Sequence, residues 1–186
     1  GNGPHSAIRT YGGPSGNDAR LGFLTTSNGG TTLTEALSIA HNSNVGIGTA
    51  SPVNKLHVAA ADGYSYLKLT SDTTGHTASD GARIGLNGND LRIINAESAN
   101  IIVQTANTER MRITSGGILL VGTTSTTPGF STTNGHAFHV GDASHMSRDG
   151  GVALVVNRGT SDGGILQFRK SGTYIGGIES RAGVVT

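Results

Sequence analysis

The chain has 186 residues, including 30 glycines and no cysteine, and its formal net charge is +1. Leucine, isoleucine, valine and phenylalanine together number only 41, so a lone domain would have little side-chain mass for a core. With 4% aromatic and 13% charged residues, neither a nucleic-acid partner nor charge-driven disorder is expected. Cysteine chemistry is excluded, and no apolar run is long enough to predict membrane insertion.

Short stretches with apolar residues at alternate positions predict β-strands, because a period of two places those residues on one face. In chain order these stretches are 37–39, 45–47, 56–58, 84–86, 91–93, 111–113 and 138–140. Turn signals separate them: Asn28-Gly29-Gly30, Asn87-Gly88-Asn89, Ser115-Gly116-Gly117, Asn134-Gly135 and Ser171-Gly172. The one stretch with helix-like character, 34–39, is too short for a helix. We therefore expect a nearly all-β chain.

An internal repeat is the strongest signal in the sequence. TEALSI at 34–39 matches TERMRI at 108–113, an offset of 74 residues, and the same offset carries Ile47-Gly48-Thr49 onto Val121-Gly122-Thr123. Later matches have an offset of 82 residues: His57-Val58 with His139-Val140, and Ser79-Asp80-Gly81 with Ser161-Asp162-Gly163. The second copy therefore carries a net insertion between Thr123 and His139.

These offsets predict the organisation of the chain. Residues 1–33 are the end of a preceding repeat, since Ala19–Phe23 echoes Ala82–Leu86. Residues 34–107 form one repeat and residues 108–186 a second, with an insertion near 124–138 and a truncated end. Because the chain also begins without methionine, it is expected to be a window of a longer repeating array.

The repeat bears on function, because a catalytic site is normally built once and a fibre is built by repetition. Short strands with one apolar face and few aromatic residues gain stability when identical chains cover that face and the strand edges. The small number of large apolar residues therefore favours an obligate oligomer over a monomer.

Three segments resemble the recurring shaft segments of bacteriophage tail fibre proteins. They are TEALSI with NVGIGTASPVNKLHV (34–39 and 44–58), TERMRITSGGILLVGTT (108–124) and GGILQFRKSGTYIGGIE (163–179). The resemblance implies an elongated homotrimeric fibre of short repeated strands and hairpins, a triple-stranded β-helix or β-prism-like shaft. Such shafts are often followed by an intramolecular chaperone domain.

The same resemblance implies a structural part of the virion, in the phage tail. Its partners would be other copies of itself, other tail or baseplate proteins, and a host surface glycan or protein receptor. Neither an enzymatic activity nor a cofactor is expected.

Receptor contacts are expected in loops, because strands build the shaft. The loops at 124–134, where the insertion falls, and at 142–150 are the candidates. Their candidate contact residues are Thr126, Thr127, Phe130, Asn134, Asp142, His145 and Arg148.

His57 and His139 occupy matching repeat positions between apolar residues. Alternation turns them away from their apolar neighbours, so solvent-facing side chains are expected. In a trimer, one such histidine per chain would instead place three around the axis, which suits a transition metal. Glu35 and Glu109 also match, and we expect structural pairs with Arg83, Arg110 or Arg112.

Gly159–Gly163 fits the GxSxG pattern of a hydrolase nucleophile, which needs a strand before the serine and a helix after it. Ala153–Val156 is a possible strand, but another strand at 165–168 is expected to follow, so a turn is favoured. Two alternative functions stay open. A fragment of a polysaccharide-degrading tailspike would need paired carboxylates, and a trimeric bacterial surface adhesin would need an outer-membrane anchor.

Overall fold

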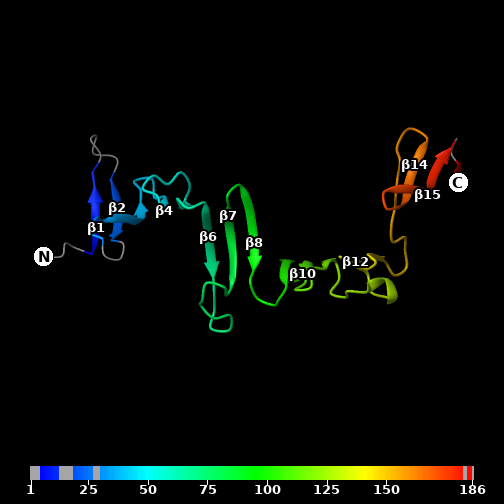
Figure 1. Cartoon of the computed structure of the whole chain (residues 1–186), viewed down its shortest axis with the longest axis horizontal. Coiled ribbons are helices and arrows are strands. Elements are labelled where there is room, and N and C mark those ends of the chain that lie inside the picture. The colour runs from blue at the N-terminus through cyan, green and yellow to red at the C-terminus, as the bar shows by residue number, and fades with distance from the viewer. Residues whose placement is uncertain (1–4, 13–18, 27–29, 182–183, 186) are drawn as a thin grey trace. The chain divides into compact units, whose positions relative to one another are not determined.

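The computed structural model describes residues 5–12, 19–26, 30–181 and 184–185. The chain folds as two compact units, residues 1–98 and 99–186, and each holds one five-stranded and one three-stranded sheet (Figure 1). Apart from the 3-10 helix η1 (Pro128–Phe130), the regular elements described are strands, which confirms the all-β prediction. None of the described segments is a helix with the length and apolar character of a membrane span.

The five-stranded sheet of the first unit has the order β1-β2-β3-β4-β5. Its strands are β1 (Ser6–Tyr11), β2 (Arg20–Thr25), β3 (Thr34–Ile39), β4 (Val45–Ile47) and β5 (Leu56–Val58). All pairs are antiparallel except β4 with β5. The three-stranded antiparallel sheet consists of β6 (Tyr64–Leu69), β7 (Ala82–Asn87) and β8 (Asp90–Asn95).

The second unit has a five-stranded sheet in the order β13-β12-β11-β10-β9, in which all pairs are antiparallel. Its strands are β9 (Ile101–Thr105), β10 (Thr108–Ile113), β11 (Leu119–Val121), β12 (Gly135–Phe138) and β13 (His145–Ser147). The smaller sheet consists of β14 (Gly163–Lys170), β15 (Thr173–Arg181) and β16 (Val184–Val185). The repeat boundary predicted after residue 107 lies within the β9–β10 hairpin.

Most of the predicted strands and turns are present. The strand predicted at 138–140 ends at Phe138, and Val140 is 90% exposed. The possible strand at 153–156 has no regular structure. The turn at Ser171-Gly172 joins β14 to β15, as the hairpin-like segment 163–179 suggests. The turn predicted at Asn28-Gly29-Gly30 lies largely outside the described residues.

The β3–β4 and β10–β11 hairpins share one backbone path. Their paired residues are Leu37–Ile47, Ser38–Gly46 and Ile39–Val45 in the first, and Met111–Val121, Arg112–Leu120 and Ile113–Leu119 in the second. Every pair is displaced by the predicted 74 residues. In both copies a β-bulge comes before the hairpin. It lies opposite Phe23 and Leu24 in the β2–β3 pair and between Glu109 and Met111 in the β9–β10 pair. The sequence repeat is therefore a repeat of hydrogen-bonding register as well.

The two copies differ in what covers one face of this hairpin. Gly46 and Leu120 are equivalent and both buried. A Cβ on Gly46 would lie 2.3 Å from the carbonyl oxygen of Thr49, because the loop after β4 folds back over the strand and accepts a hydrogen bond from Ser38. In the second copy the loop after β11 does not fold back over the strand in this way, so the larger side chain of Leu120 fits.

The opposite face of each five-stranded sheet carries the alternating apolar residues in cross-strand rows. The rows are Leu21–Ile39–Val45–Leu56 and Phe23–Leu37–Ile47–Val58 in the first sheet, and Ile101–Ile113–Leu119–Phe138 and Val103–Met111–Val121 in the second. We call these the row faces. None of these side chains is buried.

Few side chains form a core. Among the described residues, Leu24, Leu120 and Ala137 are the buried hydrophobic ones. The chain exposes 13134 Å², whereas two separate compact units of half its mass would together expose about 10,000 Å². The excess surface agrees with apolar faces that the chain itself does not cover.

Candidate functional site

The two loops predicted to contact a receptor lie together in the second unit. The His139 ring donates from Nε2 to the carbonyl oxygen of Thr126 at 2.7 Å. The backbone N–H of Asp149 donates to Oδ1 of Asn134. The bond between Asn134 and Asp149 ties the 124–134 loop to the 142–150 loop, and the bond between Thr126 and His139 ties the first loop to the end of β12. We call this region the loop cluster.

The short helix η1 is positioned by close packing on β12 and β13. Pro128 is fully buried and begins the helix, where its missing N–H costs no hydrogen bond. Gly129 is equally constrained, because a Cβ there would lie 2.6 Å from Nδ1 of His145. The insertion therefore supplies a lid over the face that Leu120 and Ala137 occupy.

His145 lies beneath this lid. It is 8% exposed, and its ring centroid lies 5.0 Å from that of Phe130 in an edge-on arrangement and 5.5 Å from that of His139. His145 is therefore a packing residue, and its predicted role in receptor contact is not supported by its burial. Phe130, in contrast, is 83% exposed and presents most of its ring to solvent.

The remaining candidate contact residues lie elsewhere in the two loops. Arg148 and Asn134 line an open pocket of about 470 Å³ together with His136, Ser147 and Val152. The carbonyl of Thr127 accepts the N–H of Phe130 and closes the turn of η1. The carboxylate of Asp142 accepts the N–H of the next residue, Ala143, within its own loop.

The equivalence of His57 and His139 is wrong as a structural match. Leu56 and Phe138 do pair with equivalent residues, Val45 and Leu119. Because β5 runs parallel to β4 while β12 runs antiparallel to β11, the next position along the ladder is filled by His57 in one copy and Ala137 in the other. His139 lies beyond the end of its strand.

The expectation that His57 faces solvent also differs from the structure. Its side chain is half-buried, and Nδ1 is buried with no hydrogen-bond partner among the described residues. Within one chain, the described His, Asp and Glu residues form no group of three that would hold a metal ion. A metal on a trimer axis needs residues of three chains and stays a prediction.

The matching glutamates do form structural ion pairs. Both oxygens of the Glu109 carboxylate accept hydrogen bonds from Arg112, as predicted. This guanidinium lowers the pKa of Glu109. Glu35 instead binds Arg20 of β2 through two 3.1 Å hydrogen bonds, so its predicted partners were wrong. These bonds raise the pKa of Arg20, whose guanidinium also lies 4.0 Å over the ring of Tyr11.

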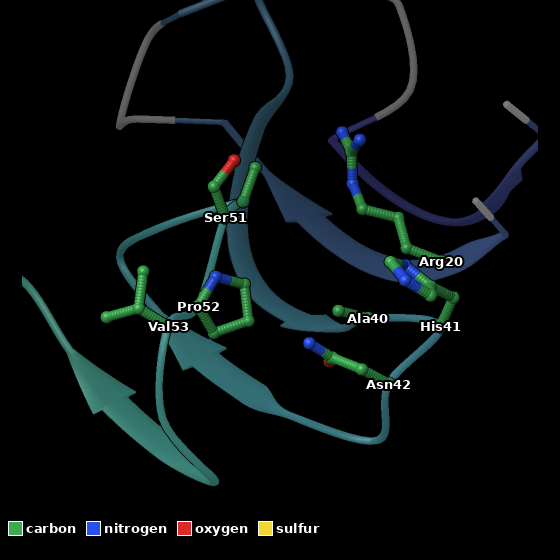
Figure 2. Close-up of a pocket in the computed structure, with 8 residues that line it drawn as sticks. Arg20, Ala40, His41, Asn42, Ser51, Pro52 and Val53 are labelled. Atoms are coloured by element: carbon green, nitrogen blue, oxygen red, sulfur yellow. The ribbon is translucent and has the colours of Figure 1, made fainter.

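A second open pocket, of about 330 Å³, lies in the first unit and includes Arg20, His41 and Asn42. Figure 2 shows the guanidinium of Arg20 turned away from His41 and Asn42. Asn42 is engaged in the β3–β4 turn, where its side chain accepts the N–H of Asn44 and its carbonyl accepts from Lys55. Arg20 and Asn42 of this pocket are therefore engaged in contacts that stabilise the fold.

Ser161 lies in a turn. Its carbonyl and hydroxyl oxygens both accept hydrogen bonds from Arg158, and strand β14 follows at once. The residues before it form no strand. The strand–serine–helix geometry of a hydrolase nucleophile is absent from this described segment.

One set of polar residues in the sheet β6-β7-β8 was not predicted as a candidate site from the sequence. Tyr64, Tyr66 and Lys68 alternate along β6 with the apolar residues, and Arg83 and Arg92 lie on β7 and β8. The signal was the same period of two that predicted the strands, applied to the polar positions instead of the apolar ones.

Comparison with known proteins gives no match, either to a protein-family model or to a curated protein sequence. Function therefore has to be inferred from the chain itself.

Proposed function

We propose that the chain is a structural, non-enzymatic segment of a bacteriophage tail fibre. It would act as a homotrimeric β-rich shaft in the virion, joined to other tail or baseplate proteins. Its task would be to support attachment to a glycan or protein receptor on the host surface.

The observation that carries this proposal is the pair of row faces. Equivalent apolar residues, such as Ile39 and Ile113 or Ile47 and Val121, are partly exposed to solvent in both copies. Each buried apolar side chain contributes on the order of 1.5–3 kcal/mol relative to an exposed one, so a partner surface is needed for these faces to stabilise the fold. Identical chains provide such a surface at every repeat, which a unique partner does not.

The loop cluster supports a role in attachment near this segment. The insertion is present in one copy of the repeat and absent from the other, so the shared architecture does not require it. It presents Phe130 to solvent on a backbone that includes buried Pro128, and Arg148 of the 142–150 loop is exposed as well. Exposed aromatic and arginine side chains are residue types enriched in binding hot spots.

The mass of the 186-residue chain under native conditions tests the architecture. We expect a species of three chains that persists on dilution. A stable monomer with the same β-sheet content would overturn the proposal. Incubation with bacterial capsular polysaccharides tests the absence of enzymatic activity, since released reducing ends would favour a tailspike instead.

A further inference from the structure

The three-stranded sheet β6-β7-β8 has two chemically opposite faces. Figure 1 shows its strands side by side. The register places Leu67, Ile84 and Ile93 in one row, and all three are exposed. The alternate positions form the other face, which we call the Tyr–Arg face after its polar side chains Tyr64, Tyr66, Lys68, Arg83 and Arg92. The register also places Asn87, Gly85, Asp90 and Ile94 on it.

A glycine separates two of the polar side chains of the Tyr–Arg face, and the backbone of β6 crowds it, because a Cβ on Gly85 would lie 1.9 Å from the carbonyl oxygen of Ser65. Tyr66, Gly85 and Arg92 form one cross-strand row, so the position between the tyrosine and the arginine carries no side chain. Tyr64 lies two residues before Tyr66 on the same face and is 55% exposed. Arg83 lies diagonally across from Tyr66, with its guanidinium carbon 5.7 Å from the ring centroid.

Within the described part of the chain, no ion pair joins a cation of this face to a carboxylate. Lys68 donates to the carbonyl oxygens of Thr77 and Ala78. Nε of Arg83 is buried with no hydrogen-bond partner in the described part of the chain. The exposed Arg92 likewise makes no ion pair there. The register adds one carboxylate to the face, that of Asp90 in the row of Tyr64.

We infer that the Tyr–Arg face binds an acidic saccharide, a sugar that carries a carboxylate. The planar guanidinium of Arg92 matches a carboxylate through two parallel hydrogen bonds. The exposed ring of Tyr64 offers an apolar surface to the C–H face of a sugar ring, while its hydroxyl stays wet. Nucleic acid suits the face less well, because its closely spaced phosphates call for a longer run of cations.

This inference rests on the proposed function in one respect. A trimer that covers the Leu67–Ile84–Ile93 face leaves the opposite face of the same sheet outward. This face belongs to the first unit, and the loop cluster belongs to the second.

Calorimetric titration of the whole chain tests the inference, with oligogalacturonate as the acidic probe and maltooligosaccharide of equal length as the neutral one. We expect binding of the acidic probe alone, weakening as salt is raised. Arg92→Gln should weaken it about tenfold, the loss of one charge-assisted interaction. Arg9→Gln is the matched control, since it removes the same charge from an exposed position on β1.

No binding by the wild-type chain, equal binding of the neutral probe, or equal loss in Arg9→Gln would overturn the inference. Tighter binding of single-stranded DNA than of oligogalacturonate would overturn the choice of ligand. Native mass, measured on the same samples, separates the two proposals. A monomer that binds the acidic probe through Arg92 refutes the trimer alone, and a trimer that does not bind refutes this inference alone.

Discussion

Ser43 and Gly117 occupy the same place in the β3–β4 and β10–β11 turns, and both have left-handed backbone, with φ of 62° and 82°. Glycine adopts this conformation freely, whereas a residue with a Cβ pays about 1–2 kcal/mol for it. The first copy tolerates serine because Asn42 holds the turn through its hydrogen bond to the N–H of Asn44.

Exchanging these two residues tests the equivalence of the turns. Ser43→Gly should leave stability unchanged or raise it, and Gly117→Ser should lower it by about 1 kcal/mol, because only the second adds a Cβ to a left-handed residue. Thermal unfolding of both variants measures the effect. Equal destabilisation by both changes would contradict the shared backbone path.

The Glu109–Arg112 pair predicts a dependence of stability on pH. Arg112 lowers the pKa of Glu109 below its ordinary value of 4.5. The ionised form of the carboxylate is therefore favoured more strongly in the folded state than in the unfolded state. This stabilisation is present above that value and is lost as pH falls through the lower pKa of the folded state.

Glu109→Gln removes this contribution. The melting temperature of the variant should lie below that of the wild-type chain at neutral pH, and the difference should vanish in acid. Melting curves recorded between pH 7 and pH 3 measure it. A difference that does not change with pH would show that the pair adds nothing through its charge.

At the scale of elements, the hairpins were predictable and the connections between them were not. Strand positions follow from a period of two, which pairs such as Leu37 and Ile39 display on their own. The direction of β12 depends on the path of the insertion, and nothing in the residues around 124–134 signals whether the chain returns parallel or antiparallel. That path decides whether Ala137 or His139 takes the position beside β11 that His57 takes beside β4.

The lid formed by η1 also escaped prediction, because a single turn has no periodicity. Its proline and glycine are ordinary turn residues in the sequence, and only the structure shows that they pack on β12 and β13. For the same reason, deleting the insertion is a poor test of receptor contact, since the deletion would uncover buried apolar side chains.

Gly129→Ala tests the lid without removing it. The added methyl group would press on the His145 ring, 2.6 Å away, and overpacking of this kind costs about 1–3 kcal/mol. Hydrogen exchange should speed up across 124–134 while β14 and β15 stay protected. Gly116→Ala is the control, because the added Cβ would lie at an ordinary 3.8 Å from its nearest neighbour, Thr114 Oγ1.

At the scale of the whole molecule, the scarcity of large apolar residues takes on a different meaning. The apolar residues are concentrated on the row faces and on the Leu67–Ile84–Ile93 face. Few large apolar side chains, such as Leu120, lie on the covered side, where small or polar residues such as Ser38 and Gly46 are found. A monomeric sheet protein has the reverse arrangement, with its apolar side inward. The distribution therefore favours a core shared between chains.

A charge placed on both row faces tests this shared core. Ile47 and Val121 are equivalent and 43% and 36% exposed. The double variant Ile47→Lys, Val121→Lys should break the trimer, because each lysine would be buried without a partner in every chain at a cost of at least about 2 kcal/mol. Sedimentation over a range of concentrations measures the loss of the three-chain species. Val140→Lys is the control, because Val140 is 90% exposed and lies outside both faces. A double variant that stays trimeric would place the contacts between chains on other surfaces.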